Sequence, residues 1–285
     1  MTSFLWKNNA PFALCPTHDV DKIKKYPYQY LYYCFHGGIG AQVKTLKKRM
    51  TGYDPYWNFE SIMELEDQLG IRSTFFFLNE SACGFGPKYW GRYDITDIRV
   101  KQIIRQLDAG GWEIGLHGSL NSYKDLALLQ REKMILEDIL GKRIRSIRQH
   151  YLNFLVCTTL RIQKASGLDF DSTIGSSKYI PNELNTMIPY YPDNSGMLEI
   201  PITLMDTVGL EHIQISNKAR EAIYKTAHLG GSVVLDWHQC AFNLDENFPR
   251  VNFFIETLKW AKESGAWIAT LSEVGDAWIQ WSRNI

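Results

Sequence analysis

The chain has 285 residues, of which 45% are apolar, and its 31 basic residues balance its 31 acidic ones. This length allows a large α/β core, and the balanced charge gives no overall basic field to hold nucleic acid or anionic lipid. The amino terminus does not resemble an export signal and no apolar run reaches membrane-spanning length, so we expect no membrane span and a cytoplasmic location.

Short apolar runs alternate with helical patterns along the chain. The expected strands are 12–15, 73–78, 112–116, 144–148, 197–202, 232–235 and 267–270, and the expected helices are 59–69, 98–108, 125–140, 158–166, 219–228 and 251–264. Such alternation predicts a parallel sheet, either doubly wound or closed, and about seven strands favour a barrel.

The domain prediction is one unit over 1–285, because several helices end at a glycine that leads directly into a strand, as at Gly70 and Gly141. Two segments depart from the alternation. We expect an insertion or lid at about 22–57, where the aromatic run at 26–33 either packs on the core or forms a sugar-stacking rim. A long excursion is expected at about 175–196.

Two aspartates one residue apart, Asp19 and Asp21, follow the first apolar run. Alternate residues of a strand lie on one face, and two carboxylates so close require a cation or a shared proton. The alternative is a solvated turn that the neighbouring lysines neutralise.

Polar residues also follow other expected strands. They are His117, Arg148 and His150, Asp206, and Asp236 with His238. Parallel α/β folds gather the carboxyl ends of their strands at one mouth, so these residues are expected to converge with the two aspartates. An Asp and a His with a further ligand and an open position are typical of hydrolases that hold a divalent metal.

The order of these motifs resembles the polysaccharide deacetylase family, the NodB-homology or family 4 carbohydrate esterases. Thr17-His18-Asp19-Val20-Asp21 is similar to the first motif in a branch with an inserted residue, and His117-Gly118-Ser119-Leu120-Asn121 resembles the His-Ser-x-x-His motif, with Asn121 at the second His. Arg148-Gln149-His150-Tyr151 resembles the Arg-x-Pro motif, and Leu235-Asp236-Trp237-His238 resembles the closing Leu-x-x-His motif. The resemblance spans roughly Pro11 to Ser272 and implies a distorted (β/α)7 TIM-like barrel.

The resemblance also implies roles for individual residues. Asp21 and His117 would bind one divalent metal ion, zinc or another, and Asn121 stands where the family has the next ligand. His150, where the family has a proline, is the other candidate to complete the ligand set, and the alternative for it is a histidine whose hydrogen bonds go to neighbouring backbone groups. The implied catalytic residues are Asp19 as base, His238 as acid, Arg148 to aim the base, and the Tyr151 amide to hold the oxyanion. Trp237, Asp206 and Glu199 are the candidate substrate-binding residues, and the last two have alternative roles in shaping loops or pairing with Arg148.

The expected function is that of a metal-dependent hydrolase that removes an N-acetyl group from an amino sugar or a polysaccharide precursor. Its partner would be a carbohydrate. One alternative is a catalytically impaired carbohydrate-binding protein on the same barrel, because the second motif has lost a histidine. The other is an amidohydrolase that acts on a non-sugar amide. The five scattered cysteines indicate a reducing compartment.

Overall fold

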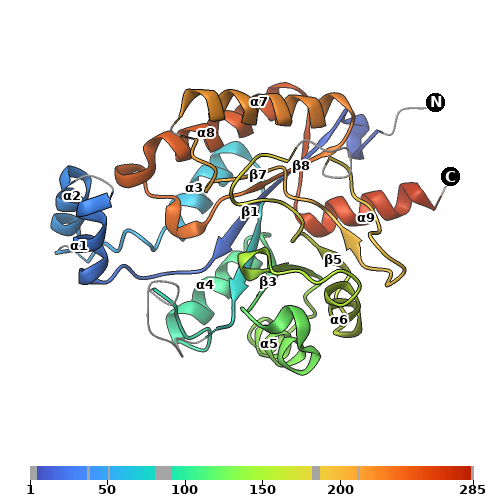
Figure 1. The fold of residues 1–285 in the computed structure, drawn as a ribbon, viewed down its shortest axis with the longest axis horizontal. Helices are drawn as coiled ribbons and strands as arrows, with labels where there is room; N and C mark the ends of the chain where they lie inside the picture. Colours follow the sequence, from blue (N-terminus) through green and yellow to red (C-terminus); the bar gives the residue numbers. More distant parts are fainter. Residues whose placement is uncertain are drawn as a thin grey trace.

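A curled parallel sheet forms the centre of the protein, in a computed structural model that describes residues 5–36, 39–50, 52–80, 91–181, 187–210 and 212–283 (Figure 1). Its strands run in the order β6-β5-β4-β3-β2-β1-β8-β7, with β9 beside β1, and every strand pair within these ranges is parallel. The strands are β1 (Ala13–Val20), β2 (Thr74–Leu78), β3 (Glu113–Gly118), β4 (Ser146–Gln149), β5 (Phe170–Asp171), β6 (Leu198–Glu199), β7 (Leu204–Met205), β8 (Ser232–Asp236) and β9 (Trp267–Ile268). The predicted parallel α/β architecture is therefore confirmed.

Helices connect the strands and cover the outside of the sheet (Figure 1). They are α3 (Phe59–Leu69), α4 (Ile98–Ala109), α5 (Leu126–Leu140), α6 (Thr159–Ala165), α7 (Ile213–His228), α8 (Leu244–Glu263) and α9 (Leu271–Ser282). Two further helices, α1 (Pro27–His36) and α2 (Ile39–Arg49), project from the end of the molecule toward which β1 points, away from both termini. No helix within the described ranges is both long and apolar enough to cross a membrane.

Side chains alternate between two environments along β1, and this alternation positions the site. Ala13 and Cys15 belong to the apolar cluster inside the curled sheet, whereas Leu14 and Val20 belong to the larger cluster under the helices. Thr17 and Asp19 continue the inner row. The barrel interior is therefore apolar at the start of β1 and becomes polar at its carboxyl end.

Several boundaries differ from the predicted ones. β1 extends to Val20 because its polar second half is buried and paired with β2 and β8, which a run of apolar residues cannot reveal. Of the strand expected at 197–202, only Leu198–Glu199 is a strand, β6, and β7 follows outside the predicted range at Leu204–Met205. The strand β5 and the helix α9 were missed, the first because it has only two residues. The segment 22–57 contains α1 and α2, and residues 182–186 of the expected excursion lie outside the described residues.

Candidate active site

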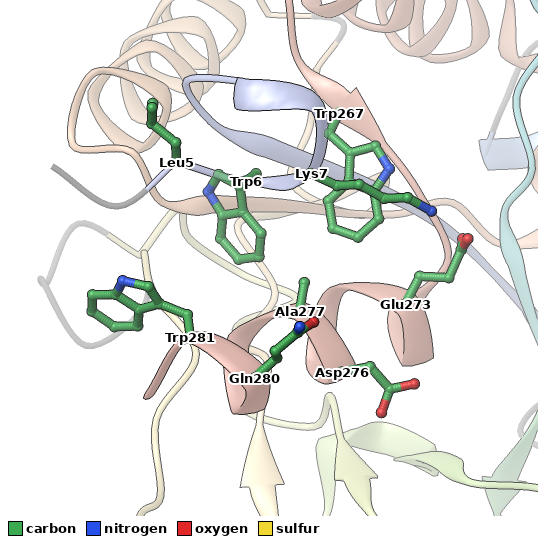
Figure 2. Close-up of a pocket in the computed structure, with 9 residues that line it drawn as sticks. All are labelled: Leu5, Trp6, Lys7, Trp267, Glu273, Asp276, Ala277, Gln280 and Trp281. Carbon is green, nitrogen blue, oxygen red and sulfur yellow. The ribbon is translucent and has the colours of Figure 1, made fainter. Parts of the chain in front are cut away.

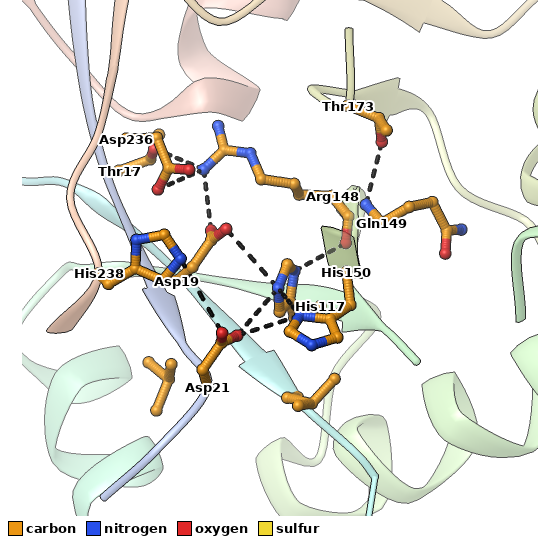
Figure 3. A network of polar contacts seen from close by, with 12 residues as sticks. Thr17, Asp19, Asp21, His117, Arg148, Gln149, His150, Thr173, Asp236 and His238 are labelled. Atoms are coloured by element: carbon orange, nitrogen blue, oxygen red, sulfur yellow. Dashed lines mark hydrogen bonds and ion pairs between the residues drawn. The ribbon is translucent and has the colours of Figure 1, made fainter. Parts of the chain in front are cut away.

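The carboxyl ends of β1, β3 and β4 bring Asp21, His117 and His150 together (Figure 3). His117 is in register with Arg148 of β4, two residues before His150. The ligand-type atoms of the three side chains lie within 4.8 Å of one another, and all three residues are buried. Asp21 Oδ1 is 3.2 Å from His117 Nε2 and 3.3 Å from His150 Nδ1.

The tautomer of His117 is fixed by the backbone. Its Nδ1 lies 2.9 Å from the carbonyl oxygen of Arg148, which can only accept a hydrogen bond, so Nδ1 is the donor and Nε2 faces Asp21. A ligating histidine is typically oriented in this way by its second nitrogen. Burial alone would lower the pKa of His117, but the carboxylates of Asp19 and Asp21 raise it above the usual value.

Arg92 contacts the outer nitrogen of His150, with Nη2 2.5 Å from Nε2. A guanidinium only donates, so Nε2 accepts and the proton of a neutral His150 lies on Nδ1, which is hydrogen-bonded to His117 Nε2 at 3.0 Å. Arg92 also donates to the Asp21 carbonyl oxygen at 3.0 Å. Ligation of a metal through Nδ1 would move the His150 proton to Nε2, where Arg92 now stands as a donor.

The base predicted at Asp19 is held by a buried arginine (Figure 3). Arg148 donates to Asp19 Oδ1 at 2.9 Å and to Thr17 Oγ1 at 2.8 Å, and its Nη1 is 3.2 Å from Asp236 Oδ1. Its other nitrogens donate to the carbonyl and hydroxyl oxygens of Ser172. Burial would raise the pKa of Asp19, but His117 and Arg148 lower it below the usual value, so the carboxylate is ionised.

Asp236 has the opposite character although it shares the same arginine. Burial, followed by the charge of Asp19, raises the pKa of Asp236 to about 7. Near neutral pH Asp236 is therefore partly protonated whereas Asp19 is ionised, and the negative charge is concentrated on Asp19.

His238 lies on the opposite side of the mouth from His150, with its Nδ1 bound to Asp206 Oδ1 at 2.8 Å. Its Nε2 points to the site, 3.9 Å from Asp21 Oδ2. The backbone N–H of His238 also donates to Asp206, so this carboxylate fixes both the ring and the main chain. Burial lowers the pKa of His238, but Asp206 outweighs it and the pKa is well above the usual value.

The turn after β4 carries backbone strain at the site. Tyr151 and Leu152 adopt positive φ angles of 58° and 53°, which non-glycine residues rarely do. The Tyr151 ring is 55% exposed and lies 4.1 Å from the His150 ring, centroid to centroid. Asn121, the alternative third ligand, is exposed at the start of the short helix 122–124, so the structure favours His150.

The three candidate substrate-binding residues are all buried. Trp237 is fully buried beside Phe253 and Phe254, because it lies between Asp236 and His238 and so faces the opposite side from them. Glu199 is fully buried and accepts from the Ile174 N–H at 2.9 Å. Asp206 is buried and paired with His238. A direct contact of these three side chains with a substrate stays a prediction.

Sequence reasoning missed Arg92, and it expected Asp236 at the mouth without pairing it with Arg148. Arg92 contacts His150 across 58 positions of sequence and belongs to no periodic element, so no local pattern indicates it. Asp236 precedes His238 of the closing motif by two residues and shares its face, a signal that period-2 alternation supplies.

A pocket of about 500 Å³ lies away from this cluster, between residues 5–7, β9 and α9 (Figure 2). Trp6, Trp267 and Trp281 line it together with Glu273 and Asp276. None of the predicted site residues contributes to it, so the candidate site is the polar cluster at the carboxyl ends of the strands.

The residues present fit a divalent cation. Asp21 Oδ1 is buried and forms no aligned hydrogen bond with a described residue, although two ring nitrogens lie within 3.3 Å. A buried carboxylate oxygen that lacks a hydrogen bond and lies beside two ring nitrogens is expected where two imidazoles and a carboxylate surround a shared ion. Two nitrogens and one oxygen leave room for at least one further ligand, as in catalytic zinc sites.

Neither a protein-family model nor a curated protein matches the sequence. Solved structures do share the fold. A protein from Mycobacterium smegmatis described as a polysaccharide deacetylase is 18% identical with a TM-score of 0.61, covering 99% of this chain and 95% of that chain. A protein from Pseudomonas aeruginosa PAO1, also described as a polysaccharide deacetylase, is 14% identical with a TM-score of 0.60. The match covers 96% of this chain and 93% of that chain. An allantoinase is 16% identical with a TM-score of 0.58, covering 96% and 92%. The chain thus has the polysaccharide deacetylase fold, a distorted (β/α)7 barrel, as the sequence predicted.

Proposed function

We propose that this protein is a metal-dependent hydrolase that removes an N-acetyl group from an amino sugar or a polysaccharide precursor. The observation that carries the proposal is the meeting of three groups at one mouth. They are the buried ligand set Asp21, His117 and His150, the ionised Asp19, and the high-pKa His238. A ligand set, a base and an acid are what metal-assisted amide hydrolysis requires.

Asp21 Oδ1, His117 Nε2 and His150 Nδ1 would hold the ion, and the mixed nitrogen and oxygen set suits zinc among the divalent metals. When bound, such an ion supplies Lewis acidity that polarises an acyl oxygen and acidifies water. Asn121 is not proposed as a ligand, because its side chain is exposed and that of His150 is buried beside Asp21.

Asp19 would take the proton of the attacking water. Its Oδ1 is occupied by Arg148, so Oδ2 is the oxygen directed toward His117, 3.6 Å from Nε2. Five contacts fix the position of the Arg148 guanidinium, one of them with Asp19. The guanidinium therefore keeps the Asp19 carboxylate ionised and holds it in one orientation.

His238 would protonate the departing amine. The bond from Nδ1 to Asp206 leaves Nε2 as the nitrogen that faces the mouth, and the raised pKa keeps this nitrogen protonated near neutral pH. Because an amine is a poor leaving group until it is protonated, an acid at this position has the largest effect on amide substrates.

The turn at Tyr151 would contribute in two ways. Its backbone N–H is the proposed donor to the oxyanion, and the positive φ is the backbone distortion that re-aims this amide. Its exposed ring, beside His150, is the aromatic surface that we propose for stacking on a sugar, in place of the buried Trp237.

Acetate release tests the proposal. The purified protein is incubated with N-acetylglucosamine oligomers, after chelation and after zinc is added back, with Asp19→Asn as the matched inactive variant. We expect acetate only from the zinc-loaded wild type. Allantoin serves as a non-sugar arm, because an allantoinase shares the fold. Oligomer binding without acetate release would support the alternative of a carbohydrate-binding protein.

We also propose that 1–285 acts as one domain with 22–57 as a lid beside the mouth. The free cysteines found among the described residues, Cys15, Cys157 and Cys240, fit the proposed cytoplasmic location.

A further inference from the structure

The balanced charge of the chain conceals a strongly basic segment. Residues 22–53 contain seven of the 31 basic residues and none of the 31 acidic ones. With histidines neutral, this segment carries a charge of +7 and the rest of the chain carries −7. The same residues form α1 and α2, which project at the end toward which β1 points (Figure 1).

Large apolar side chains of these two helices face solvent. In α2 and directly after it, Val43, Leu46 and Met50 are 43%, 46% and 88% exposed. The spacing of three and then four residues places them on one helical face. On α1, Leu31 is 63% exposed. Val43, Leu46 and Met50 thus form one stripe, and Leu31 is exposed on the adjacent helix. Exposed apolar clusters of this kind mark an interaction site.

Basic side chains accompany this stripe. Lys44 and Lys47 are exposed beside Val43 and Leu46, and Lys24 is exposed in the segment that leads to α1. Lys44 lies 2.6 Å from Asp245 at the start of α8 and retains an exposed side chain. Cations beside an exposed apolar stripe on one helix are the pattern of helices that lie in a membrane interface.

The helix pair is held in a defined position. Lys25 is fully buried, and its Nζ donates to both carboxylate oxygens of Glu246 at 2.8 Å. The same ammonium lies 4.5 Å from the centroid of the Tyr30 ring on α1. Arg49, at the end of α2, donates to the Lys25 carbonyl oxygen. These contacts fix the helices beside the active-site mouth while leaving the stripe exposed.

We propose that this surface, defined by Val43, Leu46, Met50, Lys44 and Lys47, docks the protein onto an anionic lipid bilayer. Charge complementarity selects the partner. The lysines attract anionic headgroups, and the apolar side chains enter the boundary between headgroups and acyl chains. A nucleic acid or an acidic polysaccharide would attract the lysines but has no apolar region for these side chains. Docking there would turn the mouth of the barrel toward the membrane surface and its lipid-linked molecules.

Vesicle binding tests this inference without requiring turnover, so its outcome is independent of the proposed hydrolase activity. The full chain is sedimented with vesicles of phosphatidylcholine alone and of phosphatidylcholine mixed with phosphatidylglycerol. We expect binding only to the anionic vesicles, with an affinity that decreases as salt increases.

A matched pair of variants locates the surface. Lys47→Glu/Met50→Gln changes a basic and an apolar residue three positions apart on the stripe, and Arg131→Glu/Met134→Gln makes the same changes on the exposed face of α5, where Met134 is 55% exposed. Each basic residue near an anionic membrane contributes about 1 kcal/mol, so the first variant should lose at least about fivefold in affinity and the second should lose little. Thermal unfolding checks that both variants are folded.

Equal losses in the two variants, or no binding to anionic vesicles, would overturn the proposal. Two other outcomes would also overturn it. One is binding to DNA or to an acidic polysaccharide in place of vesicles. The other is that the wild type does not bind vesicles but forms a concentration-dependent dimer, and that Lys47→Glu/Met50→Gln abolishes this dimer.

Discussion

Replacing Arg148 with methionine should destabilise the fold and disable the base together. The guanidinium is fully buried and lies 2.9 Å from Asp19 and 3.2 Å from Asp236. Methionine retains apolar contact with Phe76, over whose ring the guanidinium now lies, but leaves two buried carboxylates without the guanidinium that they share. Removing one partner of a buried ion pair costs about 3–5 kcal/mol, and we expect a loss of unfolding free energy in that range.

Arg145→Met is the matched control, three residues earlier in the chain. Arg145 is partly exposed and pairs with Asp169 at 2.9 Å and with Asp276 at 2.7 Å, where water screens the charges. We expect it to lose about 1 kcal/mol or less. Urea unfolding of both variants measures the difference, since the free energy varies linearly with denaturant.

The pH dependence of the stability loss in Arg148→Met shows whether the buried carboxylates cause it. In the wild type, the pKa of Asp19 is lowered, so its stabilising contribution is present above the unfolded pKa and lost as pH falls through the folded pKa. Without Arg148 the buried carboxylates titrate above their unfolded pKa, so stability is lost as pH rises. The loss in Arg148→Met should therefore be larger near pH 7 than near pH 4. An equal loss at both, or one no larger than that of Arg145→Met, would refute the reasoning.

Further predictions concern the acid, the base and the third ligand. His238→Ala should slow amide substrates far more than activated aryl esters. Asp206→Asn should lower the pKa of His238 and move the alkaline limb of the rate profile to lower pH, and an unmoved limb would argue against this acid. Asp19→Asn should retain metal, measured by elemental analysis, and lose about 10²–10⁴-fold in turnover. Arg92→Gln should raise zinc affinity about tenfold, because a glutamine oxygen can accept from His150 Nε2, and unchanged affinity in a zinc titration would argue against ligation through Nδ1.

Much of the candidate site could be predicted because the parallel topology of the sheet brings the site residues together. His117, Arg148 and His238 follow strands that are far apart in sequence, and a parallel sheet brings their carboxyl ends to one edge. Period-2 alternation correctly placed Asp19 and Asp21 together. The same alternation, applied after β8, would have excluded Trp237, which lies between two residues that face the site.

Other features depend on contacts that no local pattern contains. The hydrogen bond from Arg92 to His150 joins two segments that share no periodic pattern. The choice of His150 over Asn121 as third ligand depends on the conformations of the segments that follow β3 and β4. The net charge of zero gives no sign of how charge is distributed along the chain. Residues 22–53 alone carry +7, so the overall balance does not test the proposed contact with anionic lipid.

Metal content tests the central claim most directly. After incubation with excess zinc and removal of unbound metal, the wild type should contain one ion per chain. His117→Ala should contain none while remaining folded, and His228→Ala, which changes an exposed histidine at the end of α7, should contain one. Full occupancy in His117→Ala, or no zinc in the wild type, would contradict the assignment of Asp21, His117 and His150 as a metal site.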